Sequence, residues 1–294
     1  MSWAAHQFEY YAIQGHLPKR WLGKVSFLAI VVGDSTCDFV GKVWTYGFDV
    51  DGVHYGPEEP AAFHRGWPGF GFSHTIAWAL LLALLFFVLT RSRAWTTGVL
   101  LGAALHVMTD IGDSVGTMLA FPFSTQTFSI GAWTYGITTA GRDLDAAAYY
   151  SSLGFAMDVL WLAITLTNWR CLTRDYWRRH VVAADPRVWG WLGRRLPERA
   201  LVTLYRSWFL YGVGRLVAWT LWAHVIEHHE WDLRWGGPAW QPAASVVAST
   251  PAAAVVAVVV AGAVVLGAIS LLVRAPDSWW RDARLDADEI REPG

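Results

Sequence analysis

The chain has 294 residues, a net charge of −1, 54% hydrophobic residues and only 16% charged residues. Its mean hydropathy is +0.29. This composition is typical of an integral membrane protein and excludes an ordinary soluble domain. We therefore expect membrane lipid as a partner and no nucleic acid.

The N-terminal stretch is rich in aromatic and apolar side chains. It contains Trp3, Phe8, Tyr10, Tyr11 and Ile13. This pattern indicates a short helix lying at the membrane interface, from which His6 has room to turn inward. Residues 1–18 lack an apolar core with a small-residue cleavage site, so we expect the first span to direct insertion.

Six stretches approach the length of about 20 mostly apolar residues that a membrane crossing needs. They cover roughly residues 22–40, 73–91, 95–120, 147–169, 201–225 and 249–273. We predict an all-α integral membrane protein, a bundle of about six transmembrane helices with the short interfacial helix before it. Gly33, Asp34 and Asp38 interrupt the first stretch, where irregular backbone is tolerated only beside protein or a watery cavity.

Basic residues predict the orientation. They gather at Lys19, Arg20 and Lys24, at Arg91 and Arg93, from Arg170 to Arg199, and from Arg274 onward. With six spans all of these clusters fall on one side. We therefore expect a multi-pass protein of a bacterial plasma (inner) membrane with both termini in the cytoplasm. Residues 43–71 are rich in Gly, Pro and aromatics, which indicates a structured outer loop near a site.

The third stretch contains His106, Asp110 and Asp113. Ionisable groups at membrane depth are costly and usually mark function. His106 and Asp110 are four residues apart, so a helix places both on one face, a spacing that suits two ligands of one cation. At 1.5 Å of rise per residue, His106 lies near the middle of the membrane.

Other ionisable residues fall at the same outer level. They are Asp34 and Asp38 in the first span, His74 at the start of the second, and His224, Glu227 and His228 at the end of the fifth. Singly, each has a structural explanation as a hydrogen-bonded core residue or a helix cap. Together they favour a shared metal site, because each buried ion needs a partner.

In this order the residues resemble the YdjM-like family of membrane-bound metal-dependent hydrolases, over about residues 1–125. The matching positions are His6, Gly33, Asp34, Asp38, His64, Arg65, Gly66, Ser73, His74, Gly102, His106, Asp110, Gly116, Phe121, Pro122 and Phe123. Two departures stand out. The acidic pair is spaced four apart instead of two, and residues 67–72 separate the His-Arg-Gly block from Ser73-His74.

The resemblance implies a divalent metal, Zn²⁺ first, and hydrolytic chemistry in residues 1–125, with residues 126–294 adding further transmembrane helices, a cytoplasmic basic loop at 170–200 and a polar C-terminal tail. The candidate metal ligands are His6, Asp34, His64, His74, His106, Asp110 and His224. Asp34 or Asp38 is the candidate general base, and Arg65 is a candidate anion clamp because a guanidinium takes two phosphate oxygens.

Two interpretations stay open for the second half of the chain. His224 to His228 reads as an inverted zincin motif, HVIEH, or as ordinary interfacial histidines. Arg215 is a second candidate anion clamp, or it pairs with Asp158 or Glu227 inside the bundle. Asp158 is either that partner or the support of a metal-bound histidine.

The function predicted first is hydrolysis of a lipid or lipid-linked ester or phosphoester near the outer membrane face. The ligand order is also similar to that of zinc-dependent phospholipase C, which favours phosphoesters. The alternative is a non-catalytic structural subunit of a larger membrane complex. A proton or metal transport component ranks third, because the cytoplasmic halves of the spans lack acids.

Overall fold

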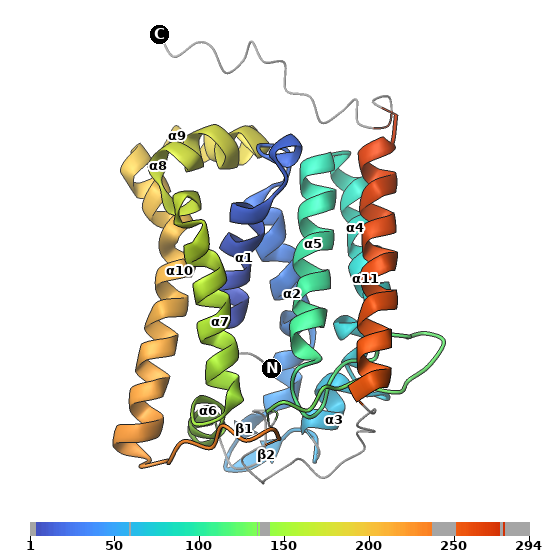
Figure 1. Ribbon diagram of the computed structural model, residues 1–294, viewed down its shortest axis with the longest axis vertical. Helices are drawn as coiled ribbons and strands as arrows, with labels where there is room; N and C mark the ends of the chain where they lie inside the picture. The colour runs from blue at the N-terminus through green and yellow to red at the C-terminus, as the bar shows by residue number, and fades with distance from the viewer. Residues whose placement is uncertain are drawn as a thin grey trace.

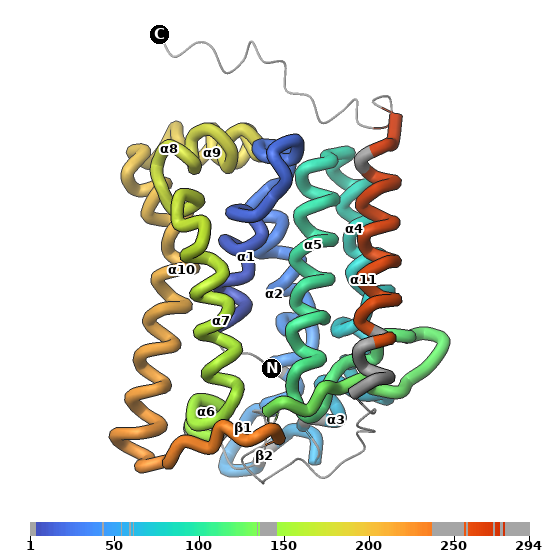
Figure 2. Tube along the Cα trace, viewed as in Figure 1, coloured from blue at the N-terminus to red at the C-terminus, as the bar shows by residue number. Residues whose placement is uncertain are grey.

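The computed structural model describes residues 4–58, 60–133, 135, 142–236, 251–276 and 279. These residues are mostly helical, as the all-α prediction requires, and the long helices stand side by side (Figures 1 and 2). The long helices are α1 (Ala5–His16), α2 (Phe27–Tyr46), α4 (Ile76–Thr90), α5 (Arg93–Asp110), α7 (Leu153–Thr167), α10 (Glu198–Leu221) and α11 (Pro251–Arg274). The polar C-terminal tail predicted from the sequence lies almost wholly outside the described residues.

Each predicted apolar stretch contains a long helix, but not every one of these helices is long enough to cross a membrane. Among the described helices, only Glu198–Ile226, which joins α10 to the π-helical turn η5 (Trp222–Ile226), is long and apolar enough to cross a membrane. Ile76–Thr90, Leu153–Thr167 and Val258–Leu272 are apolar but shorter. A 15-residue helix measures about 22 Å, less than the ~30 Å of a hydrocarbon core. Six complete spans therefore stay a prediction.

Several helix boundaries differ from the predicted ones. α5 ends at Asp110 instead of near residue 120, and an irregular chain follows it. The predicted 147–169 helix is divided into α6 (Arg142–Tyr150) and α7, because the Ser152 side chain caps the start of α7 at Gly154 N. Conversely, α2 runs unbroken through Asp34 and Asp38, since both carboxylates find partners inside the bundle.

α1 lies inside the bundle and not on the membrane surface, so the interfacial prediction is wrong. Ten of its 12 residues are buried, and it contacts α2, α5, α7 and α10. Its first turn is held by Asp158 of α7, which accepts hydrogen bonds from Ala4 N at 2.9 Å and Ala5 N at 2.8 Å. This tertiary cap satisfies backbone donors that a helix start leaves open, and it brings His6 into the core.

Glycines set the close approach of α2 and α5. A Cβ atom at Gly33 would lie 2.2 Å from Val99 O, and one at Gly102 would lie 2.1 Å from Ile30 O. Only glycine allows two helix backbones to come this near, as in small-residue contacts between membrane helices. The contact places the acidic face of α2 opposite the His106 face of α5.

The loop predicted at residues 43–71 is structured over its described residues. Strands β1 (Phe48–Val50) and β2 (Val53–Tyr55) form an antiparallel hairpin in which Phe48 pairs with Tyr55 and Val50 with Val53. Asp51 and Gly52 at the turn have φ of 50° and 80°, typical of a two-residue hairpin turn. Helix α3 (Pro60–Arg65) and the 3-10 turn η2 (Gly71–His74) then return the chain to the bundle.

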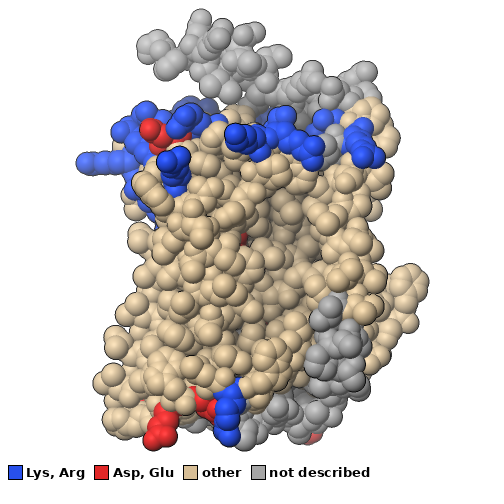
Figure 3. Space-filling view, in the orientation of Figure 1, with Lys and Arg blue, Asp and Glu red and all other residues tan. Residues whose placement is uncertain are grey.

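The opposite end is a cap of short helices rich in basic residues (Figure 3). It consists of η1 (Lys19–Trp21), η3 (Trp169–Leu172), α8 (Arg174–Tyr176), η4 (Trp177–Val182) and α9 (Pro186–Gly193). Ser26 Oγ, at the start of α2, donates to Asp185 Oδ2 of this cap at 3.0 Å, and burial raises the pKa of Asp185. The predicted basic loop is therefore folded against the bundle.

Between the two charged ends, the visible surface is almost uncharged (Figure 3). Leu84 of α4 is 57% exposed, Leu221 of α10 56% and Leu266 of α11 65%. An exposed apolar belt of this kind is unfavourable in water and favourable in lipid. The structure therefore agrees with a membrane environment.

Candidate metal centre

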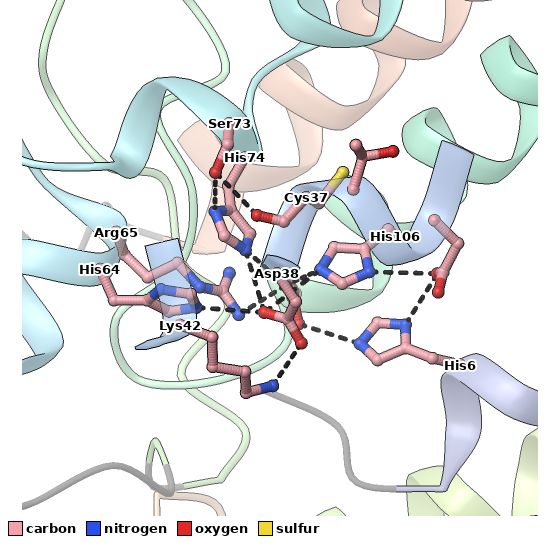
Figure 4. Close-up of polar contacts among 12 residues, drawn as sticks. His6, Cys37, Asp38, Lys42, His64, Arg65, Ser73, His74 and His106 are labelled. Carbon is pink, nitrogen blue, oxygen red and sulfur yellow. Dashed lines mark hydrogen bonds and ion pairs between the residues drawn. The ribbon is translucent and has the colours of Figure 1, made fainter. Parts of the chain in front are cut away.

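Histidine and aspartate side chains from five segments meet in the interior, at the level where α4 begins and α5 ends (Figure 4). The structure brings together His6 of α1, Asp34 and Asp38 of α2, His64 and Arg65 of α3, His74 of η2, and His106 and Asp110 of α5. All of these side chains are buried except that of Asp38, which is 18% exposed. Six of the seven candidate metal ligands thus lie in one cluster.

The centre of the cluster is the α2–α5 contact. His106 Nδ1 lies 3.1 Å from Asp34 Oδ1, and His106 Nε2 lies 3.0 Å from Asp110 Oδ2. Asp38 Oδ1 lies 3.9 Å from the same Nε2 atom. The four-residue spacing on each helix therefore produces two facing pairs of candidate ligands, as the helical period requires.

α1 closes one side of this pair. The His6 ring stacks on the His106 ring with centroids 4.0 Å apart. His6 Nδ1 lies 3.3 Å from Asp34 Oδ1 and 3.3 Å from Glu9 Oε2. Glu9 is a site residue that the sequence analysis missed, although its three-residue spacing from His6 puts both on one helix face.

The outer segment closes the other side at Asp38. His64 Nε2 lies 3.1 Å and His74 Nε2 3.4 Å from Asp38 Oδ1. Behind the rings, Thr45 Oγ1 lies 3.2 Å from His64 Nδ1 and Ser73 Oγ lies 3.1 Å from His74 Nδ1. These outer hydroxyls fix the orientation of both rings.

The outer hydroxyls also indicate which ring nitrogen is free to bind a cation. Thr45 Oγ1 donates to Gly41 O and Ser73 Oγ donates to Cys37 O, so each hydroxyl accepts from the Nδ1–H of its histidine. In a neutral imidazole, Nε2 then presents a lone pair to a carboxylate oxygen. A cation between them, a proton or a metal ion, relieves this repulsion.

Two further ring nitrogens also indicate that the cluster binds a cation. Among the described residues, the buried Nε2 atoms of His6 and His106 make no well-aligned hydrogen bond, although Asp110 oxygens lie 3.6 Å and 3.0 Å from them. Unsatisfied buried polar atoms are uncommon in native structures, and a site that binds an ion is one explanation. The residues present therefore fit a bound divalent metal, which prefers neutral imidazole and carboxylate ligands.

The candidate ligands form three overlapping groups in which all ligand atoms lie within 4.8 Å of one another. They are His6 with Asp34 and His106, Asp38 with His64 and His74, and His74 with His106 and Asp110. Because His106 and His74 each belong to two groups, the groups form one continuous set. Such an arrangement suits neighbouring metal ions that share ligands.

Arg65 faces the carboxylates of the cluster. Its Nη2 atom lies 2.5 Å from Asp110 Oδ2 and 3.8 Å from Asp113 Oδ2, and its guanidinium lies over the Tyr135 ring. Asp113 Oδ1 accepts from Val115 N and Gly116 N, which shapes the chain after α5. In this structure Arg65 therefore balances acidic charge inside the protein.

His224 lies apart from the cluster. Its Nδ1 lies 2.8 Å from His229 O, its Nε2 lies 3.4 Å from Tyr150 O, and its ring packs on Trp231. The HVIEH stretch is not one continuous α-helix, because η5 is π-helical and His228 has φ of 53°. The spacing of an inverted zincin motif therefore does not produce zincin geometry here.

Asp158 and Arg215 have separate partners. The Asp158 carboxylate accepts from Tyr149 Oη and Tyr150 Oη, both at 3.0 Å, in addition to the α1 backbone. Arg215 Nη1 donates to Gln7 Oε1 at 3.3 Å. Asp158 thus supports His6 indirectly, by holding the helix that carries it.

Comparison with known proteins gives one family. The model of the YdjM inner membrane protein family matches residues 36–182, half of the chain. The match includes Asp38, His64, His74, His106 and Asp110, and it extends beyond residue 125, where the sequence resemblance ends. No curated protein and no solved structure matches the chain. The chain belongs to the YdjM inner membrane protein family.

Proposed function

We propose that this protein is a multi-pass hydrolase of the bacterial inner membrane that depends on a divalent metal and acts on a lipid or lipid-linked ester or phosphoester near the outer face. The observation that carries the proposal is the buried cluster of imidazoles and carboxylates. In it, histidine Nε2 atoms face carboxylate oxygens, and two of them lack a well-aligned hydrogen bond. A purely structural core would pair such groups with donors.

The cluster itself suggests how the roles divide. His6, Asp34, His64, His74, His106 and Asp110 would hold the metal. Bound there, Zn²⁺ or a similar cation would polarise the ester and activate water. Asp38 is better placed than Asp34 to accept a proton from water, since its side chain is 18% exposed and that of Asp34 only 4%. Both acids have partners, Tyr10 and His106 at Asp34 and Lys42, His64 and His74 at Asp38, so exposure is what separates them.

The depth of the site supports a substrate that arrives from the membrane. The cluster lies where α4 begins and α5 ends, far from the basic cap. If the basic cap faces the cytoplasm, as the distribution of positive charge predicts, the site opens toward the outer leaflet and both termini are cytoplasmic. Helices of less than full span are then completed on the outer side by irregular chain that protein surrounds.

One observation favours the second candidate, a structural subunit of a larger membrane complex. Arg65 pairs with Asp110 and Lys42 pairs with Asp38, so part of the acidic charge is balanced within the chain. That balance is incomplete, because Asp34 and Glu9 face the histidine rings of His6 and His106 instead. The hydrolase therefore remains the first proposal.

A lipid hydrolysis assay tests the proposal. Purified protein in nanodiscs is loaded with Zn²⁺ or Mn²⁺ and screened against phospholipids and acyl esters, beside His74→Ala and His224→Ala. We expect turnover by wild type, loss of at least about a hundredfold in His74→Ala, and no loss in His224→Ala, whose ring lies apart from the cluster. Metal-free, inactive wild type that copurifies with other membrane subunits would favour the structural role instead.

A further inference from the structure

A cavity of about 760 Å³ opens beside the cluster. Its lining comes from α1, α2, α5 and α10 and includes His6, Asp34, Asp38 and His106 from the candidate metal centre. Its size falls within the range of about 300–1,000 Å³ that is typical of small-molecule sites. Any molecule in this cavity would touch the cluster directly.

The cavity lies between α2 and α10 at the flank of the bundle. Phe39 of α2 is 77% exposed and Tyr211 of α10 is 53% exposed, and both line it. α10 belongs to the stretch that is long and apolar enough to cross a membrane. An opening between these two helices therefore faces lipid more than water.

Two cationic side chains line the cavity from opposite walls. Lys42 of α2 forms an ion pair with Asp38. Arg215 of α10 donates to Gln7 Oε1 at 3.3 Å, and its guanidinium lies 5.4 Å from the centre of the Tyr211 ring. Cationic side chains at membrane depth are costly, and they commonly face a cavity and mark the path of a substrate or ion. Lysine as a point charge and arginine as a planar fork are both common phosphate binders.

We infer that this cavity admits a phosphate-bearing lipid from the side, with the phosphate between Lys42 and Arg215 and the hydrocarbon chains between α2 and α10. The inference rests on the proposed function and narrows it, since it selects a phosphoester over a carboxylic ester. Lys42 and Arg215 are specificity residues and not metal ligands. The sequence analysis named Arg65 as a candidate phosphate-binding residue, and this inference assigns that role to Lys42 instead.

Lipid binding measured by native mass spectrometry tests the inference without any catalytic readout. The probes are dioleoyl phosphatidic acid, dioleoylglycerol with the same chains and no phosphate, and glycerol 3-phosphate with no chains. Binding is measured before and after chelator treatment, for wild type, Lys42→Gln, Arg215→Gln and Arg215→Lys. Arg199→Gln, at the exposed basic end of α10, is the matched control.

We expect wild type to bind phosphatidic acid at least about a hundredfold more tightly than dioleoylglycerol, about tenfold for each of two charge-assisted contacts, and also more tightly than glycerol 3-phosphate, which lacks the chains. Arg215→Gln and Lys42→Gln should each remove about tenfold of that preference, Arg215→Lys should retain part of it, and Arg199→Gln should retain all of it. Equal binding of dioleoylglycerol would overturn phosphate recognition. Equal binding of glycerol 3-phosphate would overturn entry from the bilayer.

The outcome is separable from that of the proposed hydrolase. A protein that binds metal and hydrolyses a carboxylic ester, but shows no phosphate preference, would contradict only this inference. A phosphate preference in a protein that neither binds metal nor hydrolyses lipid would contradict only the proposed function.

Discussion

Two groups of buried carboxylates in this bundle differ in how they are satisfied. Asp158 accepts four hydrogen bonds, two from the α1 backbone and two from tyrosine hydroxyls. Asp38, which is 18% exposed, pairs with Lys42 through Oδ2, and its Oδ1 faces the Nε2 atoms of His64 and His74, whose Nδ1 atoms already donate elsewhere. Both carboxylates lie in apolar helices, so depth and residue type alone do not distinguish them.

This difference shows that the polar atoms around an acid indicate its role. An acid surrounded by neutral donors is a structural cap, and its charge is spread over several hydrogen bonds. A carboxylate oxygen that faces ring nitrogens with lone pairs needs a cation between them, even where the other oxygen is paired, as Asp38 is with Lys42. On this criterion Asp158 stabilises the fold, and the cluster around His106 is the candidate site.

The largest effect is expected from removing the structural acid. Asp158→Ala leaves four buried donors without their acceptor and should lower the free energy of unfolding by about 3 kcal/mol or more. Denaturant unfolding in detergent, followed by circular dichroism, measures this change. Asp158→Asn keeps one acceptor oxygen and should lose less. Unchanged stability in Asp158→Ala would contradict the capping role.

A smaller effect is expected at the helix contact that builds the site. Gly102→Ala puts a methyl group about where Ile30 O lies, because the Cβ would be 2.1 Å from that oxygen. Separating α2 from α5 should cost about 1–3 kcal/mol and should weaken metal binding at the same time. Gly190→Ala is the matched control, since nothing lies within 4 Å of a Cβ there. Equal losses in both variants would argue against the close contact.

The hydrogen bond that Tyr10 donates to Asp34 should contribute less to stability and more to metal affinity. Tyr10 Oη donates to Asp34 Oδ2 at 2.7 Å. Tyr10→Phe removes this hydrogen bond and should weaken metal affinity about tenfold, the usual cost of losing an outer-shell partner. Competition with a fluorescent zinc chelator gives the affinity. Wild-type affinity in Tyr10→Phe would mean that Asp34 does not bind the metal.

The smallest effect concerns Asp185, a third buried carboxylate. Burial raises its pKa in the folded protein, so its ionised form costs stability that the protonated form does not. The penalty is absent below the ordinary aspartate pKa, near 4, and grows as the pH rises through the raised value. Asp185→Asn should therefore give a small gain in stability at pH 7 and none near pH 4, measured by thermal unfolding. A gain of equal size at both pH values would contradict this cause.

Much of the site could be predicted from the sequence, because helical spacing fixes which residues share a face. The pairs Asp34 with Asp38 and His106 with Asp110 follow directly from the period of the helix. Their meeting required the α2–α5 contact, and the glycines that permit it are visible in the sequence only as part of the family resemblance. The membership in the YdjM family is confirmed, whereas the metal and the reaction stay proposals.

The errors have identifiable physical causes. The aromatic and apolar side chains of α1 indicated an interfacial helix, but the helix is held inside the bundle by Asp158, about 150 residues away in the chain, which local patterns do not reveal. Of the two interpretations left open for HVIEH, the zincin motif requires a regular α-helix, and the π-helical turn and the His228 φ of 53° break that register. The role inferred for Lys42 rests on a cavity between α2 and α10, a tertiary feature that no local spacing predicts.

Elemental analysis by plasma mass spectrometry tests the central claim most directly. Purified wild type, His106→Ala and Asp158→Asn are compared after size-exclusion chromatography shows that each is folded and monodisperse. The account predicts near-stoichiometric divalent metal, or more, in wild type and in Asp158→Asn, and background metal in His106→Ala. Wild type that holds no metal and takes up none on incubation with Zn²⁺ or Mn²⁺, or His106→Ala that keeps the full amount, would contradict it.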